Sequence, residues 1–163
     1  HYMRKTGKHF ARRLDPLAAF RAAGRQQPLD ASQKVRLGVA LRAHLEALRT
    51  GKADEMAFHN LANAVNTSMV IAEDNGPGAD YAGEIGAAQE ALIRLKSNGK
   101  HKGRWLMDGP GLQDLMRWLD VYEAQLEVVS QQEAMNALDE VKRRIRVGMV
   151  FEDQQPEGRK EAA

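Results

Sequence analysis

The sequence predicts an all-α protein, folded as an up-and-down helical bundle of four to five helices. Apolar residues return every third or fourth position over long stretches, the spacing that places them on one face of a helix. Glycine, proline and asparagine stand between these stretches, where helices end. The chain has 163 residues, which fits one domain of about 100–200 residues. It contains no cysteine, so it has no disulfides, but with 43% hydrophobic residues a chain of this length forms a core without them.

Residues 15–24 form the first expected helix, and it is short. Asp15 caps free N–H groups at its start, and Pro16 suits the first helical position because an N–H there has no partner within the helix. Gly24 ends the helix.

Three longer helices are expected over residues 31–49, 54–73 and 80–97. Gly51 supplies the left-handed residue that stops the first, and Asn98-Gly99 ends the third. The positions expected in the core are Leu37, Leu41, Leu45, Leu48, Phe58, Leu61, Ala62, Val65, Met69, Ala72, Tyr81, Ile85, Ala88, Leu92 and Leu95.

Two more helices are expected, over residues 110–129 and, after the capping box Ser130-x-x-Glu133, up to Val147. Short connections predict that these two helices lie antiparallel as a hairpin, and so do the helices over residues 31–49 and 54–73. Their expected core positions are Leu112, Leu115, Leu119, Tyr122, Leu126, Val129, Ala134, Leu138, Val141 and Ile145.

Three regions are expected along the chain. Residues 1–13 are interpreted as a disordered basic arm that starts with a tag remnant at 1–2, residues 14–148 as the helical bundle, and residues 149–163 as a disordered polar tail. Two segments fit no helix, 100–107 and 149–151, and we interpret them as a candidate two-stranded ribbon.

The composition also bears on location. No apolar run approaches the roughly 20 residues of a membrane span, and no apolar stretch follows the basic N-terminus as in a secretory signal. The absence of cysteine suits a reducing compartment. We therefore expect a cytoplasmic protein without a membrane partner.

Positive charge is concentrated in two segments. Residues 3–25 carry seven basic residues and one acid, and residues 94–104 carry five basic residues and no acid. Such clusters suit phosphate groups, and Trp105 beside the second is either a stacking platform for a base or part of the core. The nucleic-acid-binding residues expected on this interpretation are Arg4, Lys5, Lys8, Arg12, Arg13, Lys100, Lys102 and Arg104.

Two other groups of residues indicate a protein partner. Polar side chains form a stripe on the helix over residues 54–73, either as a contact surface, a solvated face or a buried hydrogen-bond network. The helix over residues 110–129 carries acids on its expected outer face, next to an aromatic residue of the kind enriched at interfaces. The candidate partner-binding residues are Asn60, Asn63, Asn66, Thr67, Trp118, Glu123 and Glu127.

His44, Glu55 and His59 form the one candidate metal site. Glu55 and His59 are four residues apart on one helix face, and His44 is roughly level with them across the expected hairpin. Two imidazoles and a carboxylate suit Zn²⁺ or Fe²⁺, but the apolar spacing leaves these residues off the core face, so we expect neither a metal nor a cofactor.

Several short motifs resemble a family of small, all-helical proteins of unknown function from proteobacterial phages, prophages and plasmids. The motifs are Asp15-Pro16-Leu17, Leu48-Arg49-Thr50-Gly51-Lys52-Ala53, Ala64-Val65-Asn66, Gly103-Arg104-Trp105-Leu106 and Ala124-Gln125-Leu126. The chain departs from the family pattern at Asp15, where Asn is expected. The resemblance implies a mobile-element accessory protein in the host cytosol, and it transfers no catalytic residue.

Together these observations predict a non-enzymatic protein-interaction module that binds a host or phage protein, alone or as a small homo-oligomer. A nucleic-acid-binding accessory protein is the alternative, and a metal-dependent enzyme is the third.

Overall fold

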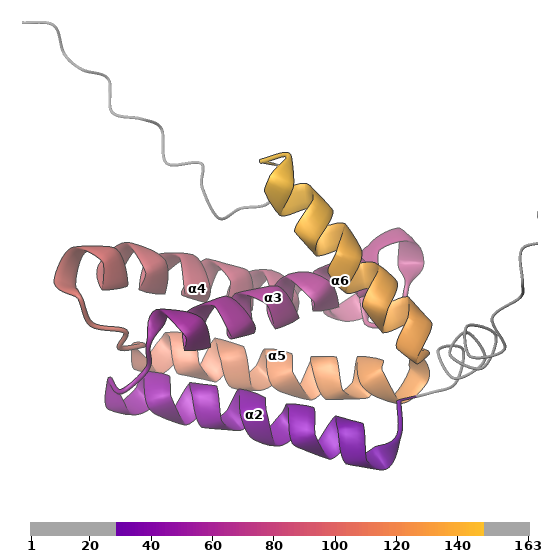
Figure 1. The fold of residues 1–163 in the computed structure, drawn as a ribbon, viewed down its shortest axis with the longest axis horizontal. Coiled ribbons are helices and arrows are strands. Elements are labelled where there is room, and N and C mark those ends of the chain that lie inside the picture. Colours follow the sequence, from indigo (N-terminus) through magenta and orange to yellow (C-terminus); the bar gives the residue numbers. More distant parts are fainter. Residues whose placement is uncertain (1–28, 149–163) are drawn as a thin grey trace, which may run out of the picture.

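The computed structural model describes residues 29–148, and this part of the chain is a bundle of α-helices (Figure 1). The all-α class predicted from the sequence is confirmed. The short helix, the arm and the tail expected at residues 15–24, 1–13 and 149–163 lie outside the described residues. The elements are α2 (Ala31–Thr50), α3 (Glu55–Ala72), the 3-10 turns η1 (Glu73–Asn75) and η2 (Ala79–Tyr81), α4 (Ala82–Lys102), α5 (Gly109–Val128) and α6 (Gln131–Arg146).

α2 begins and ends, and α6 begins, where local sequence signals lie. The Asp30 side chain accepts a hydrogen bond from the backbone N–H of Gln33 at 2.7 Å, and the Ser130 hydroxyl accepts one from Glu133 at 3.1 Å. Gly51 follows α2 with φ of 69°, a left-handed conformation that glycine adopts without steric cost. These caps and stops confirm the predicted boundaries of α2 and the start of α6.

The core lies between α2, α3, α4 and α5. α3 contacts the other four α-helices, while α2 runs beside α5 in the opposite direction (Figure 1). Phe58, Leu61, Leu115 and Leu119 are buried, as the apolar spacing predicts. Burial of apolar surface stabilises such a core by about 25 cal/mol per Å², and this is the main force that holds the helices together.

α4 is longer than the sequence predicts, because Asn98-Gly99 does not stop it. The helix continues to Lys102 and ends at Gly103, whose φ is 62°. A Cβ atom at Gly99 would lie 2.8 Å from Cε3 of Trp105. Glycine at this position lets the indole ring lie directly on the helix, which is a packing role and not a stop signal.

The segment after α4 does not form the expected ribbon within the described residues. Trp105 makes a single antiparallel bridge with Ala53, and its ring stacks on Phe58 with centroids 5.0 Å apart. The other expected strand, 149–151, lies outside the described residues. Trp105 is therefore half-buried and packs against Phe58 and the end of α4.

α6 does not lie along α5 as the short connection predicts. It packs against α3 and crosses it obliquely (Figure 1). Val129 has an extended backbone, with φ of −85° and ψ of 146°, and this residue turns the chain away from the α5 axis. Ala137 and Val141 are the buried residues of α6, whereas Ile145, expected in the core, is 37% exposed.

Candidate protein-binding site

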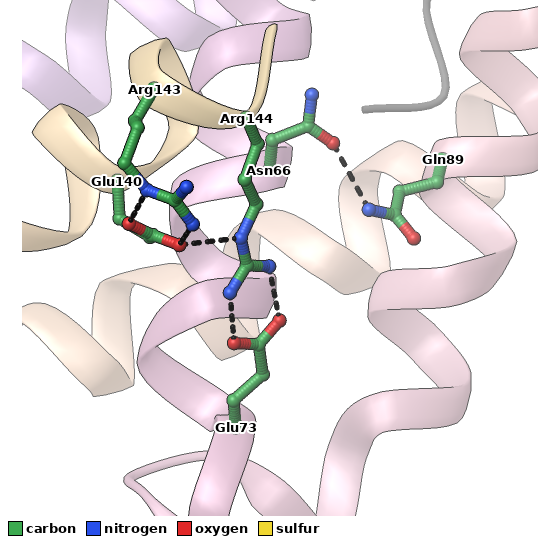
Figure 2. A network of polar contacts seen from close by, with 6 residues as sticks. All are labelled: Asn66, Glu73, Gln89, Glu140, Arg143 and Arg144. Carbon is green, nitrogen blue, oxygen red and sulfur yellow. Dashed lines mark hydrogen bonds and ion pairs between the residues drawn. The ribbon is translucent and has the colours of Figure 1, made fainter. Parts of the chain in front are cut away.

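The polar stripe on α3 is largely a buried network. Asn66 and Thr67 are buried, and the Asn66 side-chain oxygen accepts a hydrogen bond from Gln89 Nε2 at 3.0 Å (Figure 2). The Thr67 hydroxyl donates a hydrogen bond of 2.7 Å to the backbone oxygen of Asn63, a residue that is half-buried. The interpretation of Asn66 and Thr67 as contact residues is therefore wrong, because both side chains are buried, with Asn66 bonded to α4 and Thr67 to its own helix. Asn60 is exposed.

Trp118 is also buried, so its interpretation as an interface anchor is wrong. Its side chain is fully enclosed and stacks on Tyr122, with ring centroids 5.4 Å apart. Burial raises the pKa of Tyr122 to about 12. The indole Nε1 of Trp118 has no hydrogen-bond partner among the described residues, at a cost of about 1–3 kcal/mol.

Glu123 and Glu127 contact the protein's own α2. Glu127 pairs with Lys34 at 2.8 Å, and both carboxylate oxygens of Glu123 accept hydrogen bonds from the Arg42 guanidinium. The hydrogen bond with Glu123 raises the pKa of Arg42. The acidic outer face of α5 is thus partly neutralised within the chain by two pairs that link α5 to α2.

The candidate metal residues do not come together. The Nε2 atom of His44 lies 3.3 Å from Nδ2 of Asn60, while His59 Nε2 lies 3.4 Å from a Glu55 oxygen. Within residues 29–148, no group of three His, Cys, Asp or Glu side chains forms a metal site. His44 is thus level with this part of α3, as the expected hairpin predicts, but its ring contacts Asn60 and does not join Glu55 and His59 in one site.

The described part of the candidate nucleic-acid surface is small. Lys102 and Arg104 are exposed, and the Arg104 guanidinium lies so close to Gly51 that a Cβ there would be 2.8 Å from Nε. The Lys100 side chain and the arm residues Arg4, Lys5, Lys8, Arg12 and Arg13 lie outside the described part. Nucleic-acid binding stays a prediction.

A pocket that the sequence does not reveal lies between η2 and α5. We call it the η2–α5 pocket, and its volume is about 290 Å³, close to the lower size of small-ligand sites. Apolar atoms from the loop and from one face of α5 provide most of its surface, and Asp120 adds a carboxylate. Its lining residues are Pro77, Gly78, Tyr81, Asp120, Val121, Ala124 and Gln125.

Gln125 forms the floor of the η2–α5 pocket and fixes the loop above it. Its side chain is 2% exposed, and its Nε2 donates to the backbone oxygens of Ser68 at 3.0 Å and Pro77 at 2.8 Å. The Ser68 hydroxyl donates back to Gln125 Oε1 at 2.5 Å. Gly78 has φ of 83°, and a Cβ there would lie 2.7 Å from Gln125 Nε2, so the loop approaches the amide as closely as glycine permits.

A second contact holds the start of the same loop. The Arg144 guanidinium binds Glu73 through two hydrogen bonds of 2.6 Å and Glu140 through one of 2.9 Å (Figure 2). Arg143 also binds Glu140, and the two guanidinium groups lower the pKa of Glu140 to about 2. Arg144 lowers the pKa of Glu73 in the same way. Glu73 is the first residue of η1, so α6 contacts the start of the loop while Gln125 contacts it at Pro77.

The loop between α3 and α4 turns through two left-handed residues. Asp74 and Asn75 have φ of 55° and 58°, a region that Asp and Asn enter more readily than other residues with a side chain. Arg144 binds Glu73 before this turn and Gln125 binds Pro77 after it, so the loop is held at two points.

Acids lie near the edge of the η2–α5 pocket. From residue 73 to 93 the chain has five acids and neither lysine nor arginine, and of these acids Glu73 is paired with Arg144, while Arg117 is the nearest cation along α5. Asp80 is exposed beside Tyr81, and Tyr81 itself is 54% exposed at the pocket edge. An apolar pocket with an acidic border suits an apolar side chain carried on a basic segment.

Sequence reasoning missed the η2–α5 pocket although two signals were present. Gln125 occupies a position in line with Tyr122, Leu126 and Val129, where the helix pattern calls for an apolar residue. Asn75-Gly76-Pro77-Gly78 has the composition of a turn, which by itself indicates no pocket. The pocket depends on the hydrogen bond between Gln125 and Pro77, which are 48 residues apart in the sequence. The spacing of residues within one helix does not reveal such a contact.

Comparison with protein-family models, with curated proteins and with solved structures finds no match to this chain. In the part of the chain that the structure describes, no helix combines the length and the apolar character needed to cross a bilayer.

Proposed function

We propose that this protein acts by binding, and that it takes a segment of another protein in the η2–α5 pocket. The observation that carries the proposal is the apolar pocket with acids near its edge. Gln125 directs its amide into internal hydrogen bonds, so recognition depends on apolar contact and on charge. The partner segment is expected to be basic with one apolar anchor residue.

The resemblance to mobile-element proteins adds an expectation about the partner. It suggests a host or phage protein, met in the cytoplasm, while a second copy of this chain is the partner expected for a homo-oligomer. Recognition is proposed in place of catalysis because the pocket lining offers one carboxylate and one phenol as its titratable groups, Asp120 and Tyr81.

Site-specific crosslinking tests the proposal in the full-length protein. The chain has no cysteine, so Ala124→Cys places a photoreactive group only at the pocket. Ser97→Cys, on an exposed position of α4, is the matched control. Incubated with an extract of the source organism, the group at position 124 should capture a protein through a basic segment, while the group at position 97 should not.

Two further variants show whether the pocket is responsible. Tyr81→Ala and Asp120→Lys in the Ala124→Cys protein should abolish the capture, and Asp139→Lys, a charge reversal on an exposed position of α6, should retain it. Equal capture at positions 97 and 124, or an adduct that nuclease removes, would refute the proposal, and the second result would favour nucleic acid.

A further inference from the structure

The described chain begins at the same end of the bundle as the η2–α5 pocket. The ion pair between Lys34 and Glu127 places the first turns of α2 beside the last turns of α5. The loop between α3 and α4 lies at that end too (Figure 1). Residues 1–28 therefore join the bundle close to the pocket.

Distance does not prevent residues 12–25 from reaching the η2–α5 pocket. An extended chain spans about 3.3–3.6 Å per residue, so ten residues span roughly 30 Å, the length of a 20-residue helix. The start of α2 lies beside Glu127 on α5, and the pocket residues on α5 lie within two turns of Glu127.

The chemistry of residues 12–25 matches the pocket. This stretch has Arg12, Arg13, Arg21 and Arg25 against a single acid, Asp15, and the pocket border has the opposite sign. It also contains Phe20, the one aromatic residue between Phe10 and Phe58. The segment is thus basic and carries a single aromatic residue, the features that the pocket is proposed to select.

We propose that residues 12–25 of this chain bind in its own η2–α5 pocket, with Phe20 as the anchor, and compete with the partner protein. This inference rests on the proposed function. A tethered segment is present at an effective concentration of the order of 1 mM, so even a dissociation constant of about 0.1 mM leaves it bound about nine-tenths of the time. Such occupancy weakens the apparent affinity for the partner about tenfold.

Paramagnetic labelling of the full-length chain tests this directly. A nitroxide on Arg21→Cys, next to Phe20, should broaden the amide signals of Gly78 and Ala124 at the pocket and leave that of Lys102, at the far end of α4, unchanged. Phe20→Ser should abolish the effect, whereas Phe10→Ser, the matched change outside the segment, should not. Helix content measured by circular dichroism verifies that each variant is folded.

Several results would overturn the inference. They are broadening that is equal at the pocket and at Lys102, broadening that survives Phe20→Ser, and broadening that occurs only when labelled and unlabelled molecules are mixed. The last result would show that the segment binds a second copy.

The partner assay separates this inference from the proposed function. In the Ala124→Cys protein, Phe20→Ser should raise partner capture about tenfold at limiting partner concentration, the reciprocal of the occupancy effect. Unchanged capture without pocket broadening would leave the binding function in place and remove the internal competitor. If the Ala124→Cys protein captures no partner with or without Phe20→Ser, while the wild-type segment clearly broadens the pocket signals, the internal contact would stand and the proposed binding of a partner protein would be refuted.

Discussion

Gln125 offers a sharp test of how the η2–α5 pocket is held, because its amide is buried among three hydrogen-bonding atoms. Gln125→Met keeps most of the side-chain volume and removes the hydrogen bonds to Ser68 Oγ, Ser68 O and Pro77 O, which measure 2.5, 3.0 and 2.8 Å. At about 1 kcal/mol for each hydrogen bond, the expected loss of unfolding free energy is about 3 kcal/mol.

A urea titration followed by circular dichroism measures that loss. Gln113→Met, at an exposed position of the same helix, is the control and should change the unfolding free energy by less than about 0.5 kcal/mol. A double-mutant cycle with Ser68→Ala should give a coupling energy of about 1–2 kcal/mol, since the two side chains are in direct contact.

The reasoning fails if Gln125→Met costs less than about 1 kcal/mol, because one buried hydrogen bond alone should account for that much. It also fails if the coupling energy with Ser68 is zero. Either result would mean that the loop carrying Pro77 and Gly78 keeps its place without the amide.

Three other predictions address the core, the helix glycines and the α6 contact. Leu119→Ala, at a residue that is 3% exposed, should lower the unfolding free energy by about 2–5 kcal/mol in the same titration, and a neutral result would remove Leu119 from the core. Gly86→Ala should raise stability by about 0.5–1 kcal/mol, because it lies inside α4 with no atom within 4 Å of the new Cβ, and a lower thermal midpoint would contradict this. Arg144 lowers the pKa of Glu73 below its value of 4.5 in a free side chain, so the contribution of this ion pair between α6 and η1 is present above about pH 4.5 and is lost progressively as the pH falls below that value. Limited proteolysis should therefore release α6 progressively over that pH range, and Arg144→Met should make the release less dependent on pH; equal pH dependence in both proteins would show that this ion pair does not hold α6.

The sequence by itself determined the helical class and most helix starts. Asp30 and Ser130 cap α2 and α6 because a cap needs only a side chain and an N–H group three residues away. Leu41, Leu61 and Leu119 are buried because the helical period places them on one face. Such signals operate within a turn or two of helix, so they can be read from neighbouring residues.

Only the tertiary structure decided where those helices pack and which polar residues they bury. Gly99 reads as a stop, yet α4 continues because Trp105 lies against it. Trp118 and Asn66 suit a surface by residue type, yet both are enclosed by neighbouring helices. The η2–α5 pocket exists because Gln125 meets Pro77 across the bundle, and contacts between residues so distant in sequence depend on the positions of whole helices, which no local pattern specifies.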